Sequence, residues 1–332
     1  MTDNISPDPT AAIAVKDLSK RFEDVHAVKG IDFQVAPGEL FGFLGPNGAG
    51  KTTTIKMLTG LARPDSGSIC IKGIDCTPNP RAAQHLIGVV PDESNLYPEM
   101  TGFENLSFCA SLYGLKKQHR ETQARRLLKE FGLEKAAQKK FGGYSKGMKR
   151  RLTIAAGIIH QPDILFLDEP TTGIDVASAR KLRQMISDLN RNGTTIFLTT
   201  HYIEEAERLC DRIAFIVSGE IVCTDTVDNL IRPIRETHVL QISCAKKVAG
   251  IRDELGDAFP GMAFTLPETG MIRVEALEPV PAGPLVRFLE DRGAEVSEAR
   301  RIQLSLEDVF VNVTGIEAGA MRREKEKGGK KQ

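Results

Sequence analysis

Long apolar runs are missing from the sequence. The longest clean apolar segments, such as residues 164–167 and 213–217, are far shorter than the roughly 18 residues that a membrane-spanning helix needs. The first ten residues contain Asp3, Asp8 and two prolines, instead of the basic and apolar regions of a secretion signal. We therefore expect a soluble protein of the cytosol.

An excess of one charge is also missing, because 44 Lys and Arg residues balance 44 Asp and Glu residues. A basic footprint for nucleic acid over the whole chain is thereby excluded. The six cysteines are scattered, without a C-x-x-C pair or a histidine at zinc spacing, and the six histidines form no H-E-x-x-H pattern. No zinc site is predicted, and in a reducing compartment the cysteines are expected to be small buried apolar residues.

The first two thirds of the chain have the pattern of an α/β core. A length of 332 residues suggests about two domains. Alternating stretches at residues 13–18 and 30–35 predict strands of an antiparallel sheet. Residues 40–44 predict a buried strand, which a glycine-rich turn and a helix at 52–61 follow. Strand, glycine turn and helix in this order are typical of a parallel α/β core.

A helical block interrupts this core. Helices are predicted at residues 103–115, 118–131 and 146–159, and strands and helices then alternate again from 164 to 217. We interpret the block, at about residues 96–159, as a helical arm beside a nucleotide site.

The pattern changes after residue 224. Prolines separate predicted strands and helices there, the strands at residues 238–243, 271–276 and 295–303 and the helices at 248–259 and 284–293. This predicts a small α+β accessory domain. The predicted divisions are a polar lead (1–12), an α/β domain (13–225), the accessory domain (226–315) and a charged tail (316–332). The tail is basic and is expected to be solvated, with contact to acidic lipid or RNA as the alternative.

A glycine-rich turn carries the strongest functional signal. It fits the pattern G-x-x-x-x-G-K-[ST] between a strand and a helix, a context in which backbone N–H groups surround phosphate oxygens. Lys51 would reach the β- and γ-phosphates of ATP, Thr52 would bind Mg²⁺, and Thr53 would lie near the α-phosphate. The predicted ATP-binding residues here are Gly45, Pro46, Asn47, Gly48, Ala49, Gly50, Lys51, Thr52 and Thr53. The alternative, an idle glycine turn, fits the strand and helix on either side poorly.

Two adjacent carboxylates follow the buried strand at residues 164–167. Asp168 stands at the carboxyl end of the strand, where parallel sheets present ligands, and would hold Mg²⁺ directly or through water. Glu169 points elsewhere because side chains alternate along a strand, and it would polarise the attacking water as a general base. Two acids after a strand can also cap a turn, but beside a phosphate loop they indicate catalysis.

Together these residues resemble an ATP-binding cassette (ABC) transporter ATPase over about residues 13–225. Further motifs follow in the family's order. Residues 144–148 stand where the signature motif is expected, and the resemblance implies that Ser145, Lys146, Gly147 and Met148 face the γ-phosphate of a nucleotide on the opposite subunit. The departures from the common signature are similar to those of multidrug, antibiotic and ion exporter cassettes.

The resemblance also assigns three single residues. Asp175 would belong to the loop that crosses the dimer interface, and His201 would be the switch histidine that contacts the γ-phosphate. Phe22 matches the aromatic residue that stacks on adenine, which is usually tyrosine. The alternative for Phe22 is packing within the antiparallel sheet.

Position 92 departs from the family pattern. The family has a glutamine there, which contacts Mg²⁺ and the attacking water and links the site to the helical arm. Asp92 is shorter and negative. It is a candidate metal ligand whose coupling geometry differs from that of the family, and the alternative is that it faces solvent and starts the arm.

The C-terminal residues 305–315 resemble the end of daunorubicin-type exporter cassettes. Leu306, Val309, Phe310 and Val313 share one helical face, which also predicts a packed terminal helix. The resemblance implies the energy-coupling subunit of a membrane exporter, on the cytoplasmic side of the cell membrane. It would work as a cassette dimer, most simply a homodimer, with a separate membrane permease.

Two other classes of protein share a phosphate loop but fit the sequence less well. A soluble cassette protein that acts on nucleic acid or the ribosome would resemble tandem cassettes with long linkers, whereas this sequence has one cassette, so no nucleic-acid partner is expected. A P-loop GTPase would carry an N-K-x-D motif, which is absent. The predicted fold class is an α/β P-loop ATPase core with an antiparallel β-subdomain, an inserted helical subdomain and a small C-terminal α+β domain.

Overall fold

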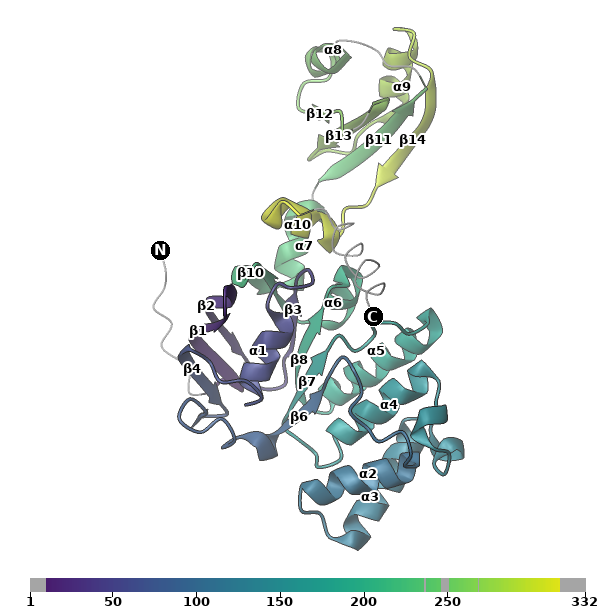
Figure 1. The fold of residues 1–332 in the computed structure, drawn as a ribbon. Coiled ribbons are helices and arrows are strands. Elements are labelled where there is room, and N and C mark those ends of the chain that lie inside the picture. The colour runs from purple at the N-terminus through teal and green to yellow at the C-terminus, as the bar shows by residue number, and fades with distance from the viewer. Residues whose placement is uncertain (1–9, 236, 246–250, 268, 317–332) are drawn as a thin grey trace. The chain divides into compact units, whose positions relative to one another are not determined.

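The computed structural model describes residues 10–235, 237–245, 251–267 and 269–316 (Figure 1). The described residues divide into two compact units, of which the first extends to Thr226 and the second is Val227–Gly315. The basic tail lies outside the described residues. In the part of the chain that is described, no helix combines the length and apolar character required to cross a membrane.

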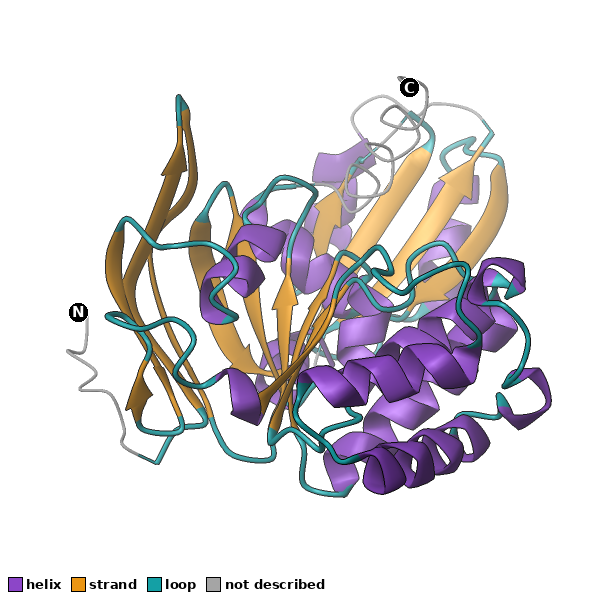
Figure 2. Ribbon diagram, turned by 60° about the horizontal axis from the view of Figure 1, so that its bottom comes forward, coloured by secondary structure: helices purple, strands orange, loops and turns teal. Residues whose placement is uncertain are grey.

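A six-stranded sheet forms the centre of the first unit. Its order is β10-β9-β3-β8-β7-β6, and its strands are β3 (Leu40–Leu44), β6 (Ile87–Val90), β7 (Ile164–Asp168), β8 (Thr195–Thr200), β9 (Arg212–Val217) and β10 (Glu220–Thr226). All neighbours are parallel except β10, which is antiparallel to β9. Because parallel strands end at the same edge, the segments that follow β3, β7 and β8 come together there (Figure 2). This edge positions the candidate site.

A four-stranded antiparallel sheet, in the order β2-β1-β4-β5, completes the β-structure of this unit. Its strands are β1 (Ile13–Phe22), β2 (Val25–Val35), β4 (Ser66–Ile71) and β5 (Ile74–Asp75). The predicted antiparallel sheet is confirmed, although its first two strands are longer than expected and β4 and β5 were not predicted. Phe33 of this sheet packs on Phe41, Phe43 and Phe197 of the central sheet, with ring centroids 5.7–5.8 Å apart. This buried aromatic cluster joins the two sheets.

Six helices of this unit surround the central sheet or form the arm: α1 (Lys51–Leu58), α2 (Gly102–Leu112), α3 (Lys117–Glu130), α4 (Lys146–Gly157), α5 (Val176–Arg191) and α6 (Ile203–Leu209). In the arm, α2 and α3 lie side by side, and α2 also packs on α4 (Figures 1 and 2). Short 3₁₀ turns lie at Gln84–Leu86, Glu134–Ala136 and Phe141–Gly143. The predicted helical insertion is therefore present.

Two predicted helix ends were wrong. The helix expected at 52–61 ends at Leu58, and the one expected at 103–115 ends at Leu112. Gly60 and Gly114 follow these ends with φ of 73° and 78°, in the left-handed region that glycine adopts readily. The glycines stop both helices earlier than the apolar pattern indicates.

The second unit is a four-stranded antiparallel sheet with two helices packed against it. Its order is β12-β13-β11-β14, and its elements are β11 (His238–Cys244), α8 (Ile251–Ala258), β12 (Ala263–Thr265), β13 (Met271–Ala276), α9 (Ala282–Glu290) and β14 (Val296–Ile302). Leu255 of α8 and Leu289 of α9 are buried in one core with Ile242 and Val274 of the sheet. The helices α7 (Val227–Arg235) and α10 (Leu306–Thr314) pack on each other before and after these elements. The first residues of the helix predicted at 248–259 lie outside the described residues, and the described part of it is α8.

Candidate nucleotide-binding site

The phosphate loop lies between β3 and α1, where two of its positions accept only glycine. A Cβ atom on Gly45 would come within 2.1 Å of the Ile216 carbonyl oxygen. Gly50 has φ of 105°, and its Cβ would lie 2.4 Å from the Ala27 carbonyl oxygen. No side chain caps the N-terminus of α1 at Gly50. The loop therefore presents the backbone N–H groups and positive dipole end of α1 to an anion.

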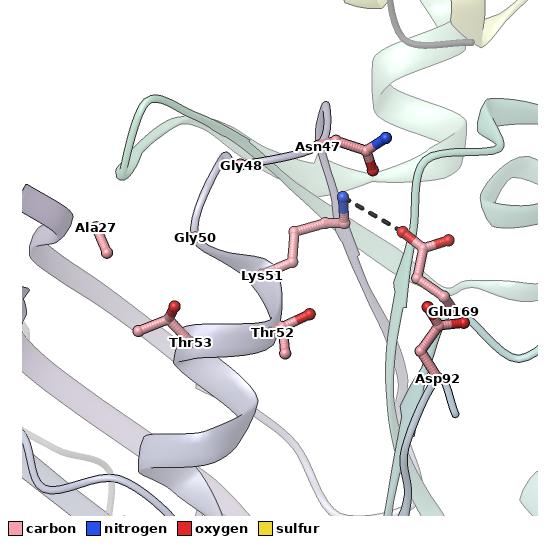
Figure 3. Close-up of a pocket in the computed structure, with 9 residues that line it drawn as sticks. All are labelled: Ala27, Asn47, Gly48, Gly50, Lys51, Thr52, Thr53, Asp92 and Glu169. Carbon is pink, nitrogen blue, oxygen red and sulfur yellow. Dashed lines mark ion pairs between the residues drawn. The ribbon is translucent and has the colours of Figure 1, made fainter. Parts of the chain in front are cut away.

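Lys51 begins α1 and is buried in the pocket. Its Nζ donates to the carbonyl oxygens of Gly45 at 2.7 Å and Pro46 at 3.1 Å, and lies 3.3 Å from Oε1 of Glu169 (Figure 3). The flexible side chain is thus held in place across the phosphate loop. Its ammonium lies where the loop would place the terminal phosphates of a nucleotide.

Asp168 is held by two threonines at the end of β7. Thr52 Oγ1 donates to one carboxylate oxygen at 2.9 Å, and Thr199 Oγ1 donates to the other at 2.5 Å. Asp168 is only 4% exposed. A carboxylate and a hydroxyl beside a phosphate loop form the oxygen donor set that suits Mg²⁺, which usually keeps waters and phosphate oxygens as its other ligands. Thr52 and Asp168 therefore fit the metal.

Glu169 lies immediately after β7 with φ of 49°, a left-handed conformation that turns it away from Asp168. Its Oε2 is 2.6 Å from Nδ1 of His201 and accepts a hydrogen bond from Thr172 at 3.0 Å. Burial raises the pKa of Glu169, but the hydrogen bond with His201 and the charge of Lys51 outweigh it and hold the pKa below its usual value. The carboxylate is therefore ionised and able to accept a proton.

One pocket contains most of the phosphate loop and the predicted base (Figure 3). It is lined by Ala27, Asn47, Gly48, Gly50, Lys51, Thr52, Thr53, Asp92 and Glu169. The structure thus brings six of the nine predicted phosphate-loop residues together with the predicted base, Glu169, whereas Gly45, Pro46 and Ala49 do not line this pocket. Asp92 is exposed to solvent but lines the same pocket, with its carboxylate on the side of Glu169. Its position fits both the predicted metal ligand and the predicted start of the arm.

The predicted signature residues lie outside this pocket. Ser145 forms the N-cap of α4, accepting from the Met148 N–H at 3.3 Å, and Ser145 and Lys146 are exposed. Gly147 lies against α5, where a Cβ atom would come within 2.7 Å of Ser178 Oγ. Within one chain, these residues cap and pack a helix and leave an exposed polar surface.

Asp175 and Phe22 also lie outside the pocket. Asp175 forms the N-cap of α5, and hydrogen bonds from Ser178 lower its pKa. The Phe22 side chain is 47% exposed at the end of β1, with the Lys20 ammonium 5.3 Å from its ring centroid. Phe22 is therefore not packed in the core of its sheet, and its exposed position is compatible with the predicted contact with adenine.

Sequence reasoning missed two polar residues beside the site. Thr199 pairs with Asp168 where β7 and β8 lie side by side. Aligning the two predicted strands in this register would have placed Thr199 beside Asp168. Arg150 lies in α4 and is buried, with its guanidinium against the backbone that flanks Glu169. An arginine in an amphipathic helix is normally expected at the surface, so no local signal indicated this position.

Comparisons with known proteins agree on one family. Residues 28–172 match the family model described as ABC transporter. The chain is 39% identical over 309 residues to the Nod factor export ATP-binding protein I of Burkholderia lata, covering 93% of this chain and 99% of that protein. It is 36% identical over 314 residues to the linearmycin resistance ATP-binding protein LnrL of Bacillus subtilis, covering 91% and 98%.

Solved structures share the fold of the first unit. One described as the ATP-binding subunit of an ABC transporter has 32% identity and a TM-score of 0.61, covering 67% of this chain and 92% of that one. A dimeric ATP-binding cassette bound to ADP and Pi has 27% identity and a TM-score of 0.60, covering 65% and 98%.

Proposed function

Because this chain belongs to the ABC transporter family and is an ATPase of that family, we propose that it is the energy-coupling subunit of a membrane exporter. The relatives named for Nod factor export and linearmycin resistance match it over more than 90% of its length. This match includes the second unit. Similarity to these export and resistance proteins over both units supports the exporter role.

The contacts of Glu169 carry the proposed mechanism. The ammonium of Lys51 and the N–H groups of the phosphate loop would hold the β- and γ-phosphates of ATP. Thr52 and Asp168 would hold Mg²⁺, which when bound neutralises phosphate charge. Glu169, ionised and held by His201, would accept the proton of the attacking water. Asp92 would be a further metal ligand from the start of the arm.

Two copies of the chain would complete each site. Ser145, Lys146, Gly147 and Met148 of one copy would face the γ-phosphate held by Lys51 of the other, with Asp175 at the interface. Ser145, Lys146 and Asp175 are exposed, and all five residues lie outside their own chain's pocket, which supports this arrangement. The dimeric cassette bound to ADP and Pi has the same fold as the first unit. Phe22 would stack on the adenine.

The proposed partner is an integral membrane permease, which would hold the cassette dimer at the cytoplasmic face of the membrane. The test is to look for a protein with about six long apolar segments in the neighbouring reading frame, to co-express it with this chain, and to follow with detergent extraction and affinity purification. The proposal predicts a stable complex whose ATPase rate changes when the transported molecule is added. Failure to co-purify with any membrane protein, together with an unchanged rate in vesicles, would contradict the export role.

A further inference from the structure

Arg150 is the buried arginine of α4, and its side chain binds only backbone. Arg150 is only 7% exposed to solvent. Nε donates to the Pro170 carbonyl oxygen at 2.8 Å and Nη2 donates to that of Asp168 at 2.6 Å. Nη1 donates to the carbonyl oxygens of Pro91 and, at 3.1 Å, Asp92. One guanidinium therefore joins two segments of chain that are distant in sequence.

The first pair of carbonyls encloses Glu169. Asp168 and Pro170 are its immediate neighbours, so Arg150 holds the peptide group directly before Glu169 and the peptide group that follows Pro170. The φ of 49° at Glu169 is costly for a residue with a side chain and persists only where the surroundings fix it. The two hydrogen bonds from Arg150 supply such a restraint. They set the direction in which the Glu169 carboxylate points.

The second pair of carbonyls begins the connection from β6 to the arm. Arg150 binds it at Pro91 and Asp92, and Thr153, one turn further along α4, donates to Ser94 Oγ at 2.8 Å. The same helix begins at Ser145. The guanidinium therefore links this connection to the backbone around Glu169 by hydrogen bonds.

Burying a charged guanidinium is unfavourable, so its hydrogen bonds and the surrounding charges must compensate for the loss of water. Burial lowers the pKa of Arg150, while Asp92, Asp168, Glu205 and Glu169 face it and favour its charged form. Its planar fork can bind several carbonyls at once, a geometry that the single ammonium of lysine cannot reproduce. A mere space-filling role would not require this fork.

We propose that Arg150 is a positioning residue for hydrolysis, which fixes the orientation of Glu169 and couples it to the connection between β6 and the helical arm. The proposal rests on the proposed role of Glu169 as general base. In the hydrogen bonds described, Arg150 binds no side chain that lines the pocket and no part of the phosphate loop. It binds one pocket residue, Asp92, through the carbonyl oxygen of its backbone. Its effect should therefore fall on kcat, while the KM for ATP stays close to that of the wild type.

Arg151 provides a matched control. It is the next residue of α4, and its guanidinium also binds backbone carbonyls, those of Phe131 at 2.8 Å, Gly147 at 3.4 Å and Gly132 at 3.5 Å. Phe131 and Gly132 belong to the arm. The contact with Gly147, a predicted signature residue, is made only at 3.4 Å and only to its carbonyl oxygen, one turn back in α4. Arg151→Lys also replaces a guanidinium that binds several backbone carbonyls, but none of those carbonyls is next to Glu169.

The experiment measures kcat, the KM for ATP and binding of a fluorescent ATP analogue for the full-length variants Arg150→Lys, Arg150→Gln, Arg151→Lys and Glu169→Gln. We expect Arg150→Lys to lower kcat by about tenfold or more, on the scale of misplacing a catalytic group, with KM and analogue affinity within about threefold. Arg150→Gln should show the same split, and Arg151→Lys should retain a kcat within about twofold of the wild type.

Three results would overturn the proposal. The first is an Arg150→Lys kcat within twofold of the wild type, and the second is an equal loss in Arg151→Lys. The third is loss of analogue binding in both Arg150 variants, which would show a role in folding or in nucleotide binding and not in orienting Glu169. Glu169→Gln separates the two hypotheses, because full activity in that variant contradicts the proposed base, whereas its inactivity beside an active Arg150→Lys contradicts only the positioning role.

Discussion

Nδ1 of His201 lies 2.6 Å from Oε2 of Glu169, and both side chains are buried. The other oxygen of Glu169 faces Lys51 at 3.3 Å. The two carboxylate oxygens are thus held by a residue after β8 and a residue of the phosphate loop. This arrangement gives the carboxylate a fixed direction and keeps it ionised despite its burial.

The hydrogen bond predicts how the acid limb of the rate profile depends on His201. Since the general base acts when ionised, and the pKa of Glu169 is lowered, the wild type should lose kcat only when the pH falls through that lowered pKa. His201→Ala removes the hydrogen bond that lowers the pKa, so its acid limb should move to higher pH. The measurement is kcat against pH, with each variant scaled to its own plateau.

Thr172 gives a graded control for this profile. It also donates to Oε2 of Glu169, at 3.0 Å, but it lowers the Glu169 pKa less than His201 does. Thr172→Val should therefore move the acid limb in the same direction by a smaller amount. Coinciding acid limbs for the wild type and His201→Ala would show that His201 does not tune the base.

The location of Asp92 in the pocket predicts an unusual dependence of ATP affinity on Mg²⁺. A carboxylate near the γ-phosphate repels it until a cation lies between them, and because Asp92 is exposed, solvent screening reduces this repulsion to about 1 kcal/mol. Asp92→Gln should bind ATP more tightly than the wild type without Mg²⁺, and its ATPase rate with Mg²⁺ should stay within about tenfold because Asp168 and Glu169 remain. The check is ATP titration of both proteins with Mg²⁺ and with EDTA. Parallel dependence on the metal in both would show that Asp92 is not a ligand.

The composite site predicts complementation between two inactive chains. Lys51→Ala removes the phosphate ligand, and Ser145→Arg blocks the exposed surface that would face the partner's nucleotide. In a mixed dimer, one of the two sites carries neither change. Mixing the singly inactive proteins should therefore restore up to about half of the activity per mixed dimer, the expectation for independent sites.

Mixed dimers are to be isolated with two affinity tags before the assay. Isolated mixed dimers without any activity would contradict independent composite sites. A mixture of Lys51→Ala with itself, tagged in the same two ways, serves as the inactive control.

Much of the first unit could be predicted because its signals are local. The phosphate loop combines a buried strand, fixed glycines and a helix start within one short segment, and Asp168 and Glu169 directly follow an apolar strand. The strand β4 was missed because Ser66, Gly67 and Ser68 have little strand propensity, and its structure depends on pairing with β1. Helix α7 was missed because Pro233 lies inside it.

The arrangement around Arg150 could not be predicted for a related reason. Its partners are 18 and 20 positions away at Asp168 and Pro170, and 58 and 59 positions away at Asp92 and Pro91. Only the packing of α4 against the ends of β6 and β7 brings these carbonyls together. Sequence patterns describe which face of a helix is apolar, but they do not show which backbone groups lie beneath it.

The most direct test of the account is Glu169→Gln, which keeps the shape of the side chain and removes the base. The account predicts a loss of turnover of about 10²–10⁴-fold with ATP binding retained. Because hydrolysis would no longer separate the subunits, an ATP-dependent dimer should also appear in size-exclusion chromatography, and it should be absent with ADP. Wild-type turnover in Glu169→Gln would contradict the assignment of Glu169 as the general base.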